Sequence, residues 1–166
     1  TMSPQKSTIV KDLYARRTLK TNSLSQYFDL AYELFNNKYF RTLFYFRTKG
    51  VAAKLLRIVY PKQASFIIDI HTKIGSGLIL AHPYSTILNA ESIGDNVYVN
   101  HLVTLGEKNG KRPVIGHHVE LHANATVIGG VTIGDYAVIG AGAVVVKSIV
   151  EKGIWVGNPT RKYEIK

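Results

Sequence analysis

The side chains best suited to chemistry in this 166-residue chain are six histidines, because the sequence contains no cysteine. An imidazole titrates near neutral pH, so a histidine can remove a proton from a hydroxyl group, and neutral histidines can also bind zinc. The lack of cysteine excludes a covalent thiolate nucleophile, a zinc-thiolate site and a disulfide framework. The histidines are residues 71, 82, 101, 117, 118 and 122.

A six-residue repeat supplies the elements that must position these histidines. Isoleucine, leucine or valine recurs at 68, 74, 80, 87, 93, 99, 105, 115, 121, 127, 133, 139 and 145. A second small or apolar set falls four residues later, at 97, 103, 119, 125, 131, 137, 143 and 149. This period predicts a parallel β-helix, in which three hexads close one triangular coil of about 18 residues. We expect a mainly β fold with about four coils.

Two interruptions of the repeat predict loops on the outside of this prism. One extra residue enters between Leu80 and Ile87, beside His82, and four enter between Leu105 and Ile115. Insertions cannot enter the packed axis of a solenoid, so they leave as loops, where chemistry is often placed. The sequence leaves open whether these loops are functional or only tolerated.

The positive charge of the chain belongs to its N-terminal part. Residues 1–62 carry twelve Lys or Arg against three acidic side chains, a balance of +9, whereas residues 63–166 carry nine against eight. No apolar run approaches the length of a membrane span and no signal-peptide pattern opens the chain, which predicts a cytoplasmic protein.

Residues 1–62 lack the repeat and are expected to form a helical segment apart from the β-helix of residues 63–166. Apolar residues at 24, 27, 28, 31, 34 and 35 follow the capping candidates Asn22 and Ser23 and predict a helix that ends near Asn36-Asn37. The stretches 38–47 and 51–60 follow, separated by Gly50. The segment could cap the open end of the β-helix, meet an anionic membrane surface at the inner membrane, or do both.

From Ile70 to Ile165 the sequence resembles the hexapeptide-repeat acyltransferases, which fold as a left-handed parallel β-helix. Within them it is similar to the serine acetyltransferase-like branch that includes capsular polysaccharide O-acetyltransferases. The resemblance rests on residues 73–82, 93–96, 103–106, 139–145 and 157–161. It implies a homotrimer with active sites between neighbouring prisms, acetyl-CoA as co-substrate and no resident metal.

The resemblance implies that His82 is the general base, which would remove the hydroxyl proton of the acceptor and return it to the CoA thiolate. No acyl-enzyme is required. The oxyanion would be stabilised by a backbone N–H near Gly106 or by the side chain of Asn100 or His101. Asp69 is the candidate partner of His82, although it lies two residues closer to the following Ile-Gly pair than in the family.

Acetyl-CoA would need small residues along its pantetheine arm and cations at its phosphates. The resemblance implies that the small residues are Gly106, Ala123, Ala141 and Gly142. The candidate cations are Lys147, Arg161 and Lys162 near the C-terminus, together with Lys108, Lys111 and Arg112 in the longer inserted loop.

Two departures from serine acetyltransferases bear on the acceptor. Ala81 stands where that family has an acidic residue before the catalytic histidine, and Arg112 stands in place of its second histidine. They favour a sugar hydroxyl of a surface polysaccharide or its precursor, with free serine as the alternative.

A different enzyme class remains open from the histidines alone. His117 and His122, together with His82, are similar in arrangement to the zinc ligands of γ-class carbonic anhydrases, which share this fold. Three neutral imidazoles and a water would form an open catalytic zinc site. A non-catalytic scaffold and a nucleic-acid binder have no motif in support, so we expect no nucleic-acid partner.

Overall fold

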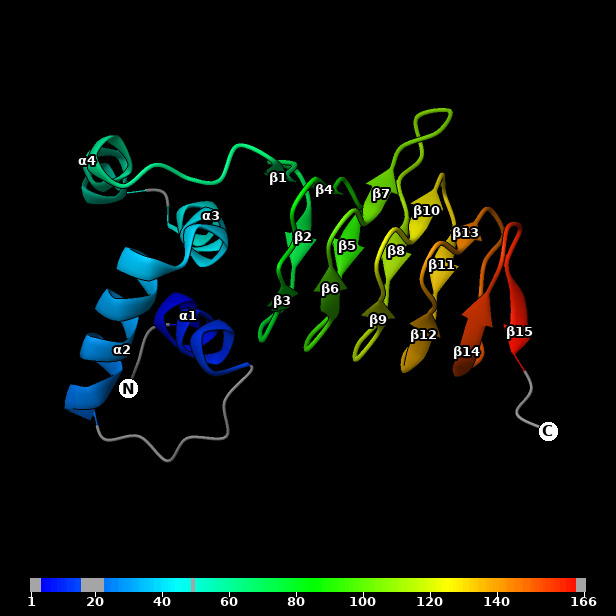
Figure 1. The fold of residues 1–166 in the computed structure, drawn as a ribbon, viewed down its shortest axis with the longest axis horizontal. Coiled ribbons are helices and arrows are strands. Elements are labelled where there is room, and N and C mark those ends of the chain that lie inside the picture. The colour runs from blue at the N-terminus through cyan, green and yellow to red at the C-terminus, as the bar shows by residue number, and fades with distance from the viewer. Residues whose placement is uncertain (1–3, 16–22, 49, 164–166) are drawn as a thin grey trace.

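The computed structural model describes residues 4–15, 23–48 and 50–163 (Figure 1). The capping candidate Asn22 lies outside these ranges. Within them, four helices precede the strands: α1 (Pro4–Tyr14), α2 (Ser23–Asn36), α3 (Lys38–Arg47) and α4 (Val51–Val59). The three helical stretches expected from the sequence between residues 24 and 60 are therefore confirmed as α2, α3 and α4.

Short strands then form three sheets, one for each face of a triangular prism. The first sheet contains β1 (Phe66–Ile68), β4 (Thr86–Leu88), β7 (Thr104–Gly106), β10 (Thr126–Ile128) and β13 (Val144–Val145). The second contains β2 (Lys73–Ile74), β5 (Ser92–Ile93), β8 (Val114–Ile115) and β11 (Thr132–Ile133). The third contains β3 (Ile79–Ala81), β6 (Tyr98–Asn100), β9 (Glu120–Leu121), β12 (Ala137–Ile139), β14 (Gly153–Val156) and β15 (Arg161–Tyr163).

Strands of consecutive coils pair in parallel, and β15 turns back antiparallel to β14 at the C-terminal end. The chain is thus a left-handed parallel β-helix, as the repeat and the resemblance predict. The first sheet stacks five strands, so the prism has about one coil more than the roughly four expected.

The core is a set of apolar side chains that stack along the prism axis. Leu88, Leu105 and Val127 are all 0% exposed, and each pairs in register with its equivalent in the next coil. The second set of the repeat, from Val97 to Ile149, is buried at the corners. Each fully buried aliphatic side chain contributes about 1.5–3 kcal/mol relative to its exposed state.

The assignment of Ile87 to the core is wrong. Ile87 is 40% exposed, whereas Leu88 is fully buried and pairs with Leu105. Leu88 therefore lies eight positions after Leu80 instead of six, so the corner that contains His82 holds two extra residues rather than one. A sequence period cannot separate two adjacent apolar residues, because only burial shows which one points inward.

The Ile-Gly pairs mark corners where consecutive coils approach closely. A Cβ on Gly94 would lie 2.5 Å from the carbonyl oxygen of Gly116, so only glycine fits there. The next residue, Asp95, accepts hydrogen bonds from the backbone N–H of Ser76 (2.6 Å) and from its hydroxyl (2.9 Å). The Ser76 backbone N–H and then its hydroxyl hold the pKa of Asp95 below its usual range.

The helices cover the open end of the prism (Figure 1). Asn37 caps α3 by accepting from the backbone N–H groups of Tyr39 and Phe40, which confirms the expected break between α2 and α3. Leu43 of α3 is 1% exposed in the core cluster, and the Tyr39 ring lies edge-on to Phe66 of β1. No helix in the described part of the chain is long and apolar enough to cross a membrane.

A buried ion pair ties these helices to the first coil. Asp12 Oδ2 lies 3.0 Å from Arg47 Nε, and the two side chains are 2% and 9% exposed. Asp12 also accepts from the backbone N–H groups of Gly77 (2.8 Å) and Leu78 (3.0 Å). Arg47 donates to the carbonyl oxygens of Ile74 and Gly75, at the start of the turn between β2 and β3. Burial raises the pKa of Asp12, and the charge of Arg47 opposes that shift.

We expect Arg47→Met to lower the free energy of unfolding by about 3–5 kcal/mol, because it leaves the Asp12 carboxylate buried without its cation. Urea denaturation measures this change. Lys62→Met, at an exposed lysine, is the control and should change stability by less than about 0.5 kcal/mol. The double variant Asp12→Asn/Arg47→Met should recover part of the loss, since no buried charge remains. A loss from Arg47→Met as small as that of the control would contradict this role.

In Asp95→Asn the free energy of unfolding should fall less steeply at acid pH than in the wild type. The folded pKa of Asp95 is lowered, so its contribution is complete above the unfolded pKa of about 3.9 and is lost as the pH falls through the lower folded value. Urea unfolding between pH 7 and pH 3 should show a steeper acid loss in the wild type than in the variant. Equal slopes would show that the bonds to Ser76 contribute nothing.

Candidate active site

One edge of the prism, between the third and first sheets, gathers five of the predicted site residues: His82, His101, Ala123, Ala141 and Gly142. We call it the histidine edge, and it comprises residues 82–85, 101–103, 122–125 and 140–143. Its turns stack through backbone hydrogen bonds from Asn124 N to His101 O (3.0 Å) and from Gly142 N to Ala123 O (2.9 Å). The structure therefore aligns His82 and His101 with three of the expected small residues, Ala123, Ala141 and Gly142, along one edge, with His82 in the first coil.

His82 is exposed at the turn between β3 and β4. Its φ is +52°, in the left-handed region that histidine and asparagine adopt more readily than most residues. Its side chain makes no hydrogen bond or ion pair with another residue of the described ranges. The imidazole is therefore accessible to a substrate that reaches this edge.

His101 lies next to His82 along the edge, because Ala81 and Asn100 pair in register on β3 and β6. Asn100 Oδ1 accepts from the backbone N–H of His101 (2.8 Å) and lies 2.7 Å from its Nδ1. Because Oδ1 can only accept, the proton of the neutral ring is assigned to Nδ1. Nε2 then has a free lone pair, so His101 can donate a hydrogen bond to an oxyanion only when it is protonated.

Asp69 and Arg112 lie on the opposite border of the first sheet. Asp69 follows β1, and its Oδ1 is 3.5 Å from Arg112 Nη1. Arg112 also donates to Glu91 Oε2 (3.1 Å). Within one chain the structure therefore does not bring Asp69 to His82, and it engages Arg112 with two carboxylates of the chain itself.

The longer insertion forms a small projecting hairpin between β7 and β8 (Figure 1). Lys108 and Lys111 exchange backbone hydrogen bonds of 3.0 and 3.1 Å across Asn109-Gly110, whose φ values are both positive. This is the geometry of a two-residue hairpin turn, for which Asn-Gly is the preferred sequence. The hairpin holds Lys111 exposed beyond the end of the first sheet, whereas Gly106 ends β7 at its base.

The C-terminal cations lie on the last coils. Lys147 and Arg161 are exposed, whereas Lys162 Nζ pairs with Glu151 at 2.7 Å. Trp155 packs against the core cluster.

The structure separates the histidines considered for zinc. His117 accepts from the backbone N–H of Asp95 (3.0 Å) at the corner between the second and third sheets, away from His82 and His122. Its neighbour His118 stacks on Tyr136. In the ranges that the structure describes, no group of three His, Cys, Asp or Glu side chains is arranged to hold a metal ion.

Sequence comparisons agree with the fold. Residues 112–147 match the family model described as bacterial transferase hexapeptide (six repeats). Serine acetyltransferase 3 of Arabidopsis thaliana is 36% identical over 117 residues, which are 65% of this chain and 30% of that protein. WcaB of Escherichia coli, named as a colanic acid biosynthesis acetyltransferase, is 32% identical over 116 residues, 68% of this chain and 72% of that protein. The chain thus spans only 30% of the first relative but most of the second.

Solved structures give the same picture. The serine acetyltransferase of Neisseria gonorrhoeae, in complex with serine, superposes with a TM-score of 0.71 at 26% identity, covering 96% of this chain and 69% of that one. Soybean serine acetyltransferase without ligand gives 0.68 at 28% identity, again covering 96% and 69%. The likeness extends through the helices as well as the β-helix.

The pairing with Asn100 makes a prediction about the His101 ring. Nitrogen NMR of labelled protein above the imidazole pKa should show His101 protonated at Nδ1, and Asn100→Ala should shift its signals toward a mixture of tautomers. His71, exposed at another corner, is the internal control and should not change. A His101 ring protonated at Nε2 in the wild type would refute the assignment.

Proposed function

Because the chain belongs to the hexapeptide-repeat acyltransferases, we propose that it transfers the acetyl group of acetyl-CoA to a sugar hydroxyl of a surface polysaccharide or its precursor. The observation that carries this proposal is the accessible imidazole of His82 at the start of the histidine edge, with small residues stacked beyond it. Acetyl-CoA is the co-substrate. The chain itself needs to supply a base, a place for the pantetheine arm and donors for the oxyanion.

In the proposed reaction His82 removes the proton of the acceptor hydroxyl as its oxygen attacks the thioester carbonyl. The carbonyl oxygen becomes an oxyanion, stabilised by a backbone N–H near Gly106, by Asn100, or by His101 in its protonated form. Collapse of this intermediate breaks the carbon–sulfur bond, and the CoA thiolate takes the proton from the His82 imidazolium. The products are the acetylated sugar and free CoA.

Two of the small residues proposed to contact the pantetheine arm have space around them for a side chain. A Cβ on Gly106 would be 3.6 Å from the nearest side chain, and one on Gly142 would meet nothing within 4 Å. Glycine is therefore not required at either position to avoid a clash. Gly142 has a φ of +68°, a left-handed conformation that favours glycine, whereas the value of Gly106 is an uncovered backbone, which suits hydrogen bonds to the amides of pantetheine.

The active protein is proposed to be a homotrimer. The first sheet of one chain separates His82 on the histidine edge from Asp69, Lys111 and Lys147 on its opposite border. A cyclic arrangement would set the border of one prism against the histidine edge of its neighbour and so complete each site. In this arrangement Asp69 would serve the His82 of a partner chain.

Three observations favour a sugar acceptor over serine. Ala81, before the proposed base, is an apolar buried residue that offers no carboxylate to an amino group. Arg112 is engaged by Asp69 and Glu91, so it cannot readily take the place of a second histidine. The chain also covers 72% of WcaB against 30% of a serine acetyltransferase. Serine remains the second candidate because the helices as well as the prism superpose on a serine-bound enzyme.

We expect His82→Asn to lower kcat by about 10² or more while the affinity for acetyl-CoA stays unchanged, because only the base is lost. Asparagine tolerates the left-handed backbone of this turn, so the fold should remain intact. Release of free thiol measures kcat, and calorimetry measures acetyl-CoA affinity. His118→Asn, at another positive-φ corner position, is the matched control.

The same assay with serine and with a panel of sugar acceptors separates the two candidates. Turnover with a sugar and none with serine would support the polysaccharide reaction, and the reverse would replace it with the serine reaction. An unchanged rate in His82→Asn would remove His82 as the base. Absence of acetyl-CoA binding by the wild type would overturn the proposed function.

A further inference from the structure

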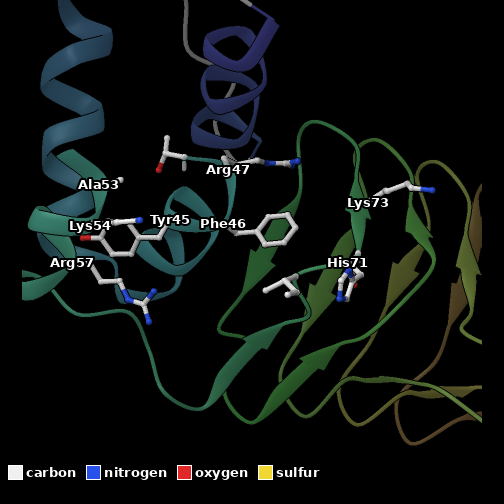
Figure 2. Close-up of a pocket in the computed structure, with 11 residues that line it drawn as sticks. Tyr45, Phe46, Arg47, Ala53, Lys54, Arg57, His71 and Lys73 are labelled. Carbon is white, nitrogen blue, oxygen red and sulfur yellow. The ribbon is translucent and has the colours of Figure 1, made fainter. Parts of the chain in front are cut away.

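A basic cavity with no place in the reaction above lies between α3, α4 and the first corner of the prism. It has a volume of about 710 Å³ and is lined by residues 45–48, by Ala53, Lys54 and Arg57 of α4, and by residues 70–73 (Figure 2). We infer that it binds the phosphate or diphosphate of an anionic sugar acceptor, an inference that rests on the proposed function.

The charged side chains that line this cavity, among the residues the structure describes, are all basic. Lys54, Arg57, His71 and Lys73 contribute to its lining, and no Asp or Glu does so. Figure 2 shows Lys54 and Arg57 of α4 on one side, and His71 and Lys73 of the first coil on the other. The Lys73 side chain extends away from α4, toward Glu91, so Lys54, Arg57 and His71 are the basic residues from two elements that lie across the cavity from one another, an arrangement that suits a phosphate group.

The basic side chains that line the cavity differ in whether they already form ion pairs within the protein. Arg47 is held by Asp12 and by two carbonyl oxygens, and Lys73 Nζ lies 3.3 Å from Glu91. Lys54 and Arg57 form no ion pair with any residue in the described ranges. An anion would therefore find two uncompensated cations on α4 without breaking an existing bond.

A hydrogen bond links the helix that carries Lys54 and Arg57 to α3. Tyr45 donates from its hydroxyl to the carbonyl oxygen of Tyr60 (2.8 Å), which ties α3 to the end of α4. Burial raises the pKa of this tyrosine, and the charges of Arg41 and Arg57 oppose that shift. Phe46 adds an apolar surface inside the cavity (Figure 2), so a bound ligand can combine a charged group with a sugar ring.

The cavity lies on the same coil as the proposed base and far from the C-terminal cations, Lys147 and Arg161, proposed for the CoA phosphates. His71 and His82 both belong to the first coil, whereas Lys147 and Arg161 lie on the last coils. Consecutive coils are about 4.8 Å apart, so the two ends of a five-strand sheet are separated by roughly 19 Å. The position suits an acceptor rather than CoA.

The outer face of α4 bears on the source of the phosphate. Val51, Leu55 and Ile58 are 73%, 61% and 78% exposed, and helical spacing sets them on a different face from Ala53 and Arg57. A sugar linked to a lipid through phosphate would meet both the cations and this apolar face. A nucleotide-linked sugar would use the cations alone.

Calorimetry with inorganic pyrophosphate tests the site directly. The wild type should bind it, and Lys54→Gln/Arg57→Gln should weaken binding at least tenfold. The matched control Lys62→Gln/Lys152→Gln removes the same charge at exposed lysines outside the cavity and should change affinity less than twofold. Both variants change only exposed side chains, and unchanged melting temperatures would confirm that they fold.

Two results would overturn the inference: no binding of pyrophosphate by the wild type, or equal weakening in the two double variants. Acetyl-CoA binding by the same proteins keeps this test apart from the proposed function. If the wild type does not bind acetyl-CoA, the proposed acetyl transfer is refuted, while the conclusion about pyrophosphate binding is unaffected. Retention of acetyl-CoA binding in Lys54→Gln/Arg57→Gln would show that the cavity is separate from the CoA site.

If the wild type binds pyrophosphate, two further binding experiments identify which phosphate-linked sugar the site accepts. One uses a uridine diphosphate sugar in solution, and the other uses vesicles of neutral lipid that contain a polyprenyl phosphate sugar. Stronger binding to the vesicles, weakened by Leu55→Ser/Ile58→Ser, would support a lipid-linked acceptor. Binding to the nucleotide sugar alone would support a free precursor, and either result supports the phosphate site.

Discussion

The pairing of each coil with the next constrains the rest of the molecule. Because strands of consecutive coils pair in register, each inward position stacks on its equivalent, as Leu105 does on Leu88 and Val127. The axis therefore favours apolar side chains, with Thr86 a buried polar exception, and inserted residues are forced to a corner or an outer face. The proposed base, His82, and the inserted hairpin lie at corners for that physical reason.

A β-helix also has open ends, and the first coil would otherwise expose Phe66 and the unpaired edge of β1. The helices remove this edge, with Leu43 entering the core and the Asp12–Arg47 pair bonding to the turn between β2 and β3. The same docking places α4 over the first corner and so creates the basic cavity. The cap therefore stabilises the fold and shapes a surface of its own.

The corners divide the chemistry between two borders of one sheet. The histidine edge presents His82 and His101 on adjacent coils, whereas the opposite border carries Asp69 and the lysines of the inserted hairpin. A rigid sheet lies between these borders, so one prism cannot bring them together. The distance between the two borders is the structural reason for proposing that each site is shared between two chains of a trimer.

The sequence by itself determined the β-helix, most of its inward residues and the limits of α2, α3 and α4, because periodicity and capping are local signals. It identified His82 and the hairpin as irregular positions. Only the tertiary structure decided that Leu88 rather than Ile87 points inward, that Arg112 pairs with Asp69 and Glu91, and that Asn100 orients His101. The Asp12–Arg47 pair and the α4 cavity join segments far apart in the chain, and no local pattern specifies which distant residues will meet.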